Sequence, residues 1–321
     1  MHSVFNPTVA LTLLFIGTSH GQNLNSNIVG CAVIPCPDDS AGNAKCTVID
    51  KTFPNVGLAR IPVTSQVLTG LSWTEGVAVN ETNGNRTFEK TFYFGTPPKA
   101  NLTGTGACAI FFNQVSKKVS FASSNVEEAQ GTCQDAMNAQ CVTALVARAE
   151  KVDITGLGNV EACAKLENSF KETVDSACTV FADGDKWNAI IVKPLTGTGA
   201  AVPITSSQNS TSNCWPITPR EYDLSLVTSV QAAGDFSVET ASTNFYGITP
   251  ILTLFYPGNG SLITKAEAQM TCMKTVGPSA SKNETKSDND NSEDKGSAGV
   301  IRGPSVTILV TAMAVLALTI V

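Results

Sequence analysis

Short hydrophobic runs separated by turn residues dominate two stretches of the chain, residues 47–121 and residues 189–273. The runs are rich in Val, Ile, Phe and Thr, and Gly, Pro and Asn stand between them. This pattern is typical of β-strands in antiparallel sheets. The dipeptide Asn83-Gly84 between two runs predicts a tight hairpin. The predicted strands cover residues 47–49, 56–61, 66–71, 76–79, 86–94, 107–112, 118–121, 189–192, 201–204, 224–229, 236–240, 248–255 and 269–273.

The middle of the chain follows a helical period instead. Residues 125–150 contain no proline, and every fourth residue from Cys133 to Leu145 is apolar. A second apolar stripe, at spacings of three and four, runs from Cys163 to Ala177. These stripes predict two amphipathic helices joined by a glycine-containing turn, which is an αα-hairpin.

Strands, then helices, then strands predict an α+β fold: an antiparallel, β-rich, sandwich-like domain with a central αα-hairpin. Strands from the two β-rich stretches are expected to pair with one another. Two domains, divided near residue 153 or near residues 206–212, are the alternative. Residues 22–51 combine three cysteines with a proline-rich turn and predict an irregular N-terminal lobe held by disulfides.

An even number of cysteines, ten, predicts five disulfides in a secreted chain. Cys108 and Cys272 each lie in a predicted strand and are candidates for joining the two β-rich stretches. The full set is Cys31, Cys36, Cys46, Cys108, Cys133, Cys141, Cys163, Cys178, Cys214 and Cys272.

The predicted αα-hairpin allows the reach between cysteines to be tested. With a turn over residues 150–159, antiparallel packing brings Cys133 and Cys178 to nearly the same height, because a helix rises about 1.5 Å per residue. Cys141 and Cys163 are roughly 7–8 Å out of step, which is more than a disulfide spans between Cα atoms. We therefore expect the pair Cys133–Cys178, unless the helices cross steeply and each cysteine pairs with the sheet.

Both ends of the chain carry processing signals. Residues 9–16 form a short apolar core followed by small residues, which predicts a secretory signal peptide cleaved after Gly21 or Ser19. Near the other end, a polar run is followed by the small residues 296–299 and an uncharged apolar tail over residues 306–321. This layout is that of a signal for a glycosylphosphatidylinositol (GPI) anchor.

A transmembrane helix is the rival interpretation of the tail. A span takes about 20 apolar residues, the tail is shorter, and no Lys or Arg follows it. Either Gly296 or Ser297 fits as the attachment residue. The acidic run 288–294 lacks the glycine and the distant Glu of a calcium loop, so it is expected to be a solvated spacer. The predicted organisation is a signal peptide (1–21), an ectodomain (22–276), a polar acidic stalk (277–296) and a removed propeptide (297–321).

The mature chain is expected to be a glycoprotein that faces the outside of the cell. The net charge is −6 and no basic patch is visible, so nucleic acid is not an expected partner. Asn-x-Ser/Thr sequons, which mark glycan acceptors on the surface of secreted proteins, stand at Asn80, Asn85, Asn101, Asn209, Asn259 and Asn283.

Histidine is restricted to His2 and His20, and both fall in the predicted signal peptide. A mature chain without histidine has no Ser-His-Asp triad, no Cys-His nucleophile and no zinc site with a histidine ligand. Cleavage after Ser19 would place His20 at the N-terminus, as in fungal copper oxygenases, but their copper site also needs a second histidine. We expect no metal and no cofactor.

Carboxylate chemistry remains open, because a glycosidase needs only two Asp or Glu residues about 5–9.5 Å apart. No spacing singles out a pair. A sugar site would also use aromatic platforms, for which Trp73, Trp187 and Trp215 are the candidates. The candidate carboxylates are Glu75, Glu81, Glu89, Asp183, Asp185, Glu221, Asp223, Asp235 and Glu239.

The segments Gly131-Thr-Cys-Gln-Asp-Ala-Met137 and Cys141-Val-Thr-Ala-Leu145, with the two end signals and the sequons, resemble a known group. The chain is similar in layout to the secreted, GPI-anchored, cysteine-containing surface proteins of filamentous ascomycete fungi, a group largely without assigned function. The resemblance carries no catalytic motif. It implies a non-enzymatic glycoprotein on the outer membrane leaflet or in the cell wall, where cell-wall glycans are possible partners. A glycan- or small-ligand-binding module and a carboxylate-dependent glycan hydrolase or transferase are the alternatives.

Overall fold

Residues 28–277 carry the fold, and the computed structural model describes residues 28–82, 84–113, 115, 118–182, 186–187 and 189–277. All of these belong to one compact unit, Met1–Asn283. The predicted signal peptide, the attachment residues Gly296 and Ser297, the sequon at Asn283 and the apolar tail lie outside the described residues.

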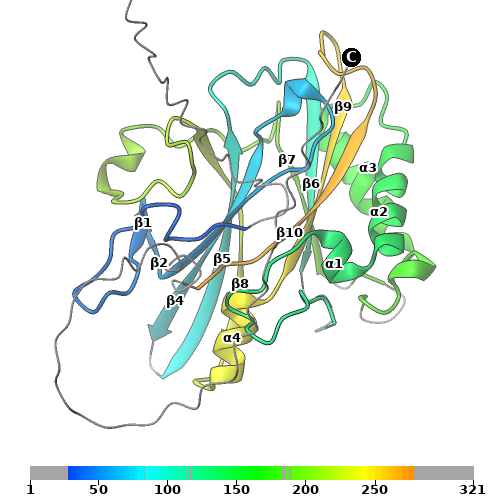
Figure 1. Ribbon diagram of the computed structural model, residues 1–321. Coiled ribbons are helices and arrows are strands. Elements are labelled where there is room, and N and C mark those ends of the chain that lie inside the picture. The colour runs from blue at the N-terminus through cyan, green and yellow to red at the C-terminus, as the bar shows by residue number, and fades with distance from the viewer. Residues whose placement is uncertain are drawn as a thin grey trace, which may run out of the picture. The chain divides into compact units, whose positions relative to one another are not determined.

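Antiparallel strands dominate the described residues (Figure 1). They are β1 (Cys46–Val48), β2 (Lys51–Phe53), β3 (Asn55–Arg60), β4 (Ser72–Thr82), β5 (Asn85–Thr96), β6 (Thr105–Asn113), β7 (Ala189–Pro194), β8 (Asp223–Gly234), β9 (Thr249–Pro257) and β10 (Glu267–Met273). One four-stranded sheet has the order β3-β4-β5-β8, the other has the order β10-β9-β6-β7, and β1 pairs with β2. Strands from the two β-rich stretches pair in both larger sheets, as predicted.

The two larger sheets pack face to face, and aromatic side chains of β4, β5 and β6 meet between them. Trp73 of β4 and Phe92 of β5 contact Phe111 of β6, with ring centroids 5.3 and 5.1 Å apart. All three side chains are fully buried. Aromatic pairs at these distances stabilise a core beyond the area that they bury. The predicted α+β sandwich is therefore confirmed.

Helices cover the outer face of the sheet β10-β9-β6-β7 (Figure 1). They are α1 (Cys133–Met137), α2 (Ala139–Lys151) and α3 (Asn159–Glu172). Phe112 points outward from β6 and meets Phe170 of α3, with ring centroids 5.9 Å apart. The helices α2 and α3 form the predicted αα-hairpin, in which Arg148 Nη1 donates a hydrogen bond of 2.6 Å to the carbonyl oxygen of Thr173.

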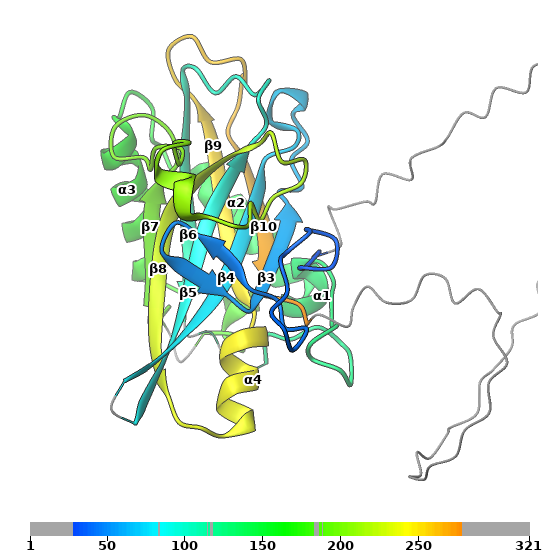
Figure 2. The same cartoon turned by 90° about the vertical axis from the view of Figure 1, so that its left-hand side faces the viewer.

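A smaller core lies on the outer face of the other sheet, where the β1–β2 hairpin covers it (Figure 2). Phe53 of β2 meets Tyr93 of β5 edge to face at 6.2 Å. The Phe53 ring also occupies the space above Gly76, where a Cβ atom would lie 2.7 Å from it. At one end of the sandwich, helix α4 (Val238–Tyr246) packs through Phe245 against Phe88 of β5 (Figure 2).

Two predicted strands are wrong because the chain forms helical turns there. In the predicted strand 236–240, Ser237 caps helix α4, and its hydroxyl accepts a hydrogen bond from Thr240 N. The predicted strand 66–71 begins with the 3₁₀ helix η1 (Gln66–Leu68).

Two further predicted strands, 118–121 and 201–204, lie outside the sheets. Residues 118–121 are irregular. Residues 201–204 form only an isolated bridge, between Pro203 and Ser225, because proline cannot donate to a ladder.

The helix predicted over residues 125–150 starts later than predicted and is divided into two helices. It begins at Cys133, where Thr132 and Asp135 form a capping box. It then breaks at Asn138, which has a φ of 63° and whose Oδ1 accepts a hydrogen bond of 2.8 Å from Cys141 N. The second helix ends at Glu172 instead of reaching Ala177.

The predicted disulfide Cys133–Cys178 is wrong, and Cys141–Cys163 and Cys108–Cys272 do not form either. Arg148 lies opposite Thr173, so the antiparallel register of α2 and α3 is shifted relative to the assumed turn. This register brings Cys141 opposite Cys178, and the break at Asn138 turns Cys133 toward the sheet. The disulfides are Cys31–Cys36, Cys46–Cys214, Cys108–Cys163, Cys133–Cys272 and Cys141–Cys178.

Candidate functional site at the open edge of the sandwich

Strands β3 and β10 are edge strands of the two facing sheets, and they lie next to each other along one side of the sandwich. At one point their backbones are in close contact, because a Cβ atom on Gly57 would lie 1.9 Å from the carbonyl oxygen of Lys274. Nearby, Val276 N donates a hydrogen bond of 3.3 Å to the carbonyl oxygen of Val56. The absence of a side chain at Gly57 therefore allows the two backbones to meet at this end of the edge.

Beyond this contact the edge opens into a groove with a volume of about 390 Å³. Volumes of about 300–1,000 Å³ are typical of sites that bind small molecules. The edge groove lies between the end of β3, strand β10 and helices α1 and α2. Its lining residues are Ile28, Ala59, Arg60, Pro62, Gly131, Thr132, Cys133, Gln134, Val142, Thr143, Val146, Gln269, Met270, Thr271 and Cys272.

The lining is mostly apolar, with a few polar groups held in place. Thr271 is 6% exposed, and its hydroxyl has no hydrogen-bond partner among the described residues. Gln269 Nε2 donates a hydrogen bond of 3.1 Å to Glu267, whose carboxylate in turn accepts one from Ser65 N at 3.1 Å. An apolar surface with a small number of oriented polar groups is the usual composition of a binding site.

The disulfide Cys133–Cys272 forms part of the groove wall. It joins the first residue of α1 to β10, with Cα atoms 5.0 Å apart. Both cysteines were predicted to be in disulfides, but the sequence did not identify them as partners. Because this bond fixes α1 to the edge strand, the groove is held open by covalent as well as packing interactions.

A second cavity, of about 230 Å³, lies beside α4 and is lined in part by Lys274, Tyr246 and Glu239. The Lys274 side chain is buried, and its ammonium donates hydrogen bonds to the carbonyl oxygens of Val126 and Ala129. Burial lowers the pKa of Lys274 to about 8, although the nearby Glu75 carboxylate opposes this shift. The contacts are to backbone, so Lys274 fastens residues 126–129 to the sandwich.

Charged groups of both signs line a third cavity, of about 690 Å³, between α2 and α3. Arg148 forms an ion pair with Asp175 at 3.1 Å and stacks over the ring of Phe170. The sequence placed Phe170 in the second helical stripe but singled out neither Arg148 nor Asp175. The mixture of charges is that of a solvated helix surface held by ion pairs.

Of the candidate carboxylates, Glu75, Glu81, Glu89 and Asp235 are engaged in separate interactions. Glu75 is fully buried between the sheets, where burial raises its pKa, and Lys90 at 3.2 Å opposes the shift. Glu81 forms an ion pair with Arg86, and Glu89 forms one with Lys51.

Near the start of α4, Asp235 accepts a hydrogen bond of 2.6 Å from the Ser237 hydroxyl, and this interaction lowers its pKa to about 2. Glu221 and Asp223 are exposed, whereas Asp183 and Asp185 lie outside the described residues.

The three tryptophans are structural. Trp73 lies between the sheets and donates a hydrogen bond of 3.0 Å to Thr253. Trp187 packs against Phe112 at 4.7 Å. Trp215 is half-buried in the smaller core and donates to the carbonyl oxygen of Tyr222 at 2.9 Å. None of them lines the edge groove.

The described sequons lie at accessible positions. Asn209, in a 3₁₀ turn, is half-buried, and the others are exposed: Asn80, Asn85, Asn101 and Asn259. None of these asparagines lines the edge groove.

No protein-family model matches this chain. The curated proteins and the solved structures likewise contain no match to it. Within the part of the chain that the structure describes, no helix is sufficiently long and apolar to cross a membrane.

Proposed function

We propose that the chain is a GPI-anchored, non-enzymatic surface glycoprotein whose sandwich domain binds a small, largely apolar ligand in the edge groove. The observation that carries this proposal is the groove itself, with its volume of about 390 Å³ and its mostly apolar lining. The exposed side chains of Gln134 and Thr143 line the groove and supply hydrogen-bonding groups that a ligand can use. Such groups orient a ligand that apolar contact holds.

The geometry favours binding over glycan hydrolysis. Hydrolysis needs two carboxyl groups that face the same sugar. Here Glu75 is enclosed between the sheets, Glu81 is paired with Arg86, and the partly buried Glu89 is paired with Lys51. A glycan-binding site would use an exposed aromatic platform, and the three tryptophans are committed to the two cores.

Surface display is consistent with the position of the groove. The exposed sequon asparagines lie outside the groove lining, so glycans attached there leave it accessible. We further propose that the apolar tail is replaced by a GPI anchor at Gly296 or Ser297, which places the domain on the outer leaflet or, after transfer, in the cell wall.

Binding is tested with the full-length protein, purified from cells in detergent and titrated with the fluorescent apolar probe 1-anilinonaphthalene-8-sulfonate. Thr143 is exposed on α2 and lines the groove, so Thr143→Trp is expected to fill part of it and weaken probe binding about tenfold or more. Ala144→Trp, one residue further on the same helix and facing the α2–α3 cavity, is the matched control. If both variants bind the probe equally well, the groove is not the binding site. If the protein does not bind the probe but binds sugars in a glycan-array screen, the glycan-binding alternative is favoured.

The anchor is tested separately by treating cells with phosphatidylinositol-specific phospholipase C. Release of the protein is the expected result. Retention, under conditions that release a known anchored control, would contradict the anchor and leave the groove proposal unaffected.

A further inference from the structure

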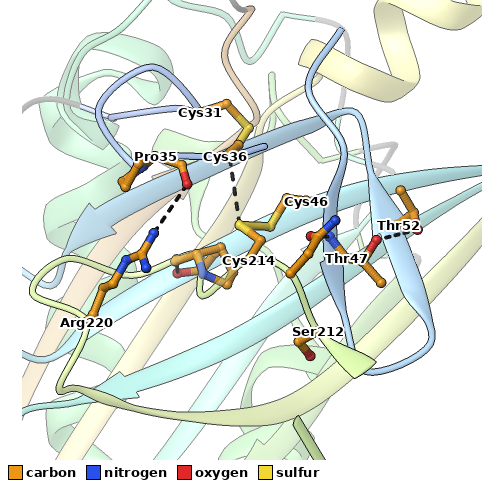
Figure 3. The surroundings of a disulfide bond; sticks show 12 residues. Cys31, Pro35, Cys36, Cys46, Thr47, Thr52, Ser212, Cys214 and Arg220 are labelled. Carbon is orange, nitrogen blue, oxygen red and sulfur yellow. Dashed lines mark hydrogen bonds between the residues drawn. A yellow bond between two sulfur atoms is a disulfide. The ribbon is translucent and has the colours of Figure 1, made fainter. Parts of the chain in front are cut away.

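Two disulfides lie against each other where the N-terminal lobe meets the loop before β8. Cys36 Sγ of the Cys31–Cys36 bond is 3.8 Å from Cys214 Sγ of the Cys46–Cys214 bond (Figure 3). The sulfur atoms of Cys36, Cys46 and Cys214 all lie within 4.8 Å of one another. A thiolate at Cys36 would therefore be in contact with a disulfide that it can attack.

The two bonds differ in accessibility. Cys31 and Cys36 are half-buried and flank a turn whose intervening residue Val33 is exposed. Cys46 and Cys214 are buried, at 0% and 4% exposure. An external thiol can therefore reach the first bond more readily than the second.

We propose that these four cysteines form a thiol–disulfide exchange site whose reaction partner is an external thiol. The thiolate of that partner attacks Cys31 Sγ, forms a mixed disulfide with it and expels the Cys36 thiolate. The Cys36 thiolate attacks Cys214 Sγ, which forms Cys36–Cys214 and breaks Cys46–Cys214. The electron pair leaves on Cys46 Sγ, which takes up a proton. One thiol is consumed and one is released, so the number of disulfides is unchanged.

The turn that carries Cys36 is joined to the loop before β8. Arg220 donates a hydrogen bond of 3.5 Å to the carbonyl oxygen of Pro35, the residue before Cys36 (Figure 3). Arg220 belongs to the same loop as Cys214, so this contact lies beside the two disulfides.

The exchange alters how the β1–β2 hairpin is held. Cys46 begins β1, and its bond to Cys214 is the covalent link between the hairpin and the loop before β8. After exchange, hydrogen bonds remain there, including those from Asn213 N and Cys214 N to the carbonyl oxygen of Thr47. The cover of the smaller core would then depend on the thiol content of the surroundings.

A pair of single variants tests the transfer directly, without added thiol. Cys31→Ser leaves Cys36 as a free thiol beside Cys214, and Cys36→Ser leaves Cys31. After incubation of the full-length protein at pH 8, alkylation and peptide mapping are expected to show alkylated Cys46 and a Cys36–Cys214 linkage in Cys31→Ser. We expect Cys46 alkylation about tenfold above that in Cys36→Ser. A free thiol confined to Cys36 in Cys31→Ser would overturn the proposal.

The unaltered protein provides a test that does not depend on how the variants fold. Treatment with reduced glutathione, an acid quench and mapping are expected to show glutathione on Cys31, a Cys36–Cys214 linkage and alkylated Cys46. Glutathione on Cys36, or Cys46–Cys214 intact beside an alkylated Cys36, would overturn the exchange.

Discussion

Gly57 provides the sharpest test of how the edge of the sandwich is built. In Gly57→Ala, the added Cβ atom would lie 1.9 Å from the carbonyl oxygen of Lys274 and 3.1 Å from Ile28 Cγ2. The closer partner is backbone, so a change of rotamer cannot relieve the clash. The strand β3 and the segment after β10 must instead move apart by more than an ångström.

The cost has two parts. Overpacking of a closely packed site costs about 1–3 kcal/mol. Separation of the backbones also weakens the hydrogen bond from Val276 N to the carbonyl oxygen of Val56, which contributes up to about 1 kcal/mol. We expect Gly57→Ala to lower the free energy of unfolding by about 1–4 kcal/mol. For a domain of this size that corresponds to a fall in Tm of roughly 2–16 °C.

The assay is thermal unfolding followed by circular dichroism, with Gly158→Ala as the matched control. Gly158 precedes α3 with a φ of −67°, and no atom lies within 4 Å of a Cβ atom built there. Alanine is a poorer N-cap residue than glycine but lowers the entropy of the unfolded chain, so the substitution is expected to change the free energy of unfolding by only a few tenths of a kcal/mol. If both variants melt at the same temperature, the close contact at Gly57 does not determine the stability of the edge.

Three further predictions concern the helices and the buried lysine. Phe170→Ala removes a fully buried ring that packs against Phe112, and urea unfolding should show a loss of about 3–5 kcal/mol. Gly158→Ser supplies the capping side chain that α3 lacks and should raise stability by a few tenths of a kcal/mol in the same assay. Lys274 has a pKa lowered to about 8, so the unfolded state binds more protons above that pH, and its contribution to stability rises with pH. Urea unfolding at pH 7 and pH 9.5 should therefore show the unaltered protein gaining up to about 2 kcal/mol relative to Lys274→Met, and an equal pH response in both would contradict the burial of this group.

The spacing of hydrophobic residues was sufficient to predict most of the strands and the αα-hairpin. Strands and helices repeat their buried positions with different periods, and the sequence shows both. It was insufficient where a single side chain decides the local conformation. Ser237 is a helix N-cap residue, but the alternation of Phe236 and Val238 with polar residues favoured a strand. Asn138 is a helix breaker only because its amide caps the following helix. Both signals are present in the sequence and were outweighed by the surrounding hydrophobic period.

The candidate site depended on contacts that no local pattern contains. Gly57 and Lys274 meet although they are far apart in the chain, and the groove exists because β3 and β10 diverge beyond that contact. The disulfide partners were missed for the same reason. A shift in the register of the αα-hairpin changes the cysteine opposite Cys178 from Cys133 to Cys141. The spacing of residues in the sequence cannot resolve such a shift.

The five disulfides are placed so that none joins the two facing sheets to each other. Cys108–Cys163 and Cys133–Cys272 attach helices to one sheet, while Cys46–Cys214 attaches the β1–β2 hairpin to the loop before β8. The interface between the sheets is held by apolar packing, which a large buried aromatic core can sustain without cross-links. The outer layers bury less apolar surface, so packing stabilises them less, and the disulfides there supply additional stability. The edge groove and the proposed exchange site both lie where such a cross-linked layer joins the sandwich, so the proposed ligand binding and thiol exchange would both leave the core between the sheets intact.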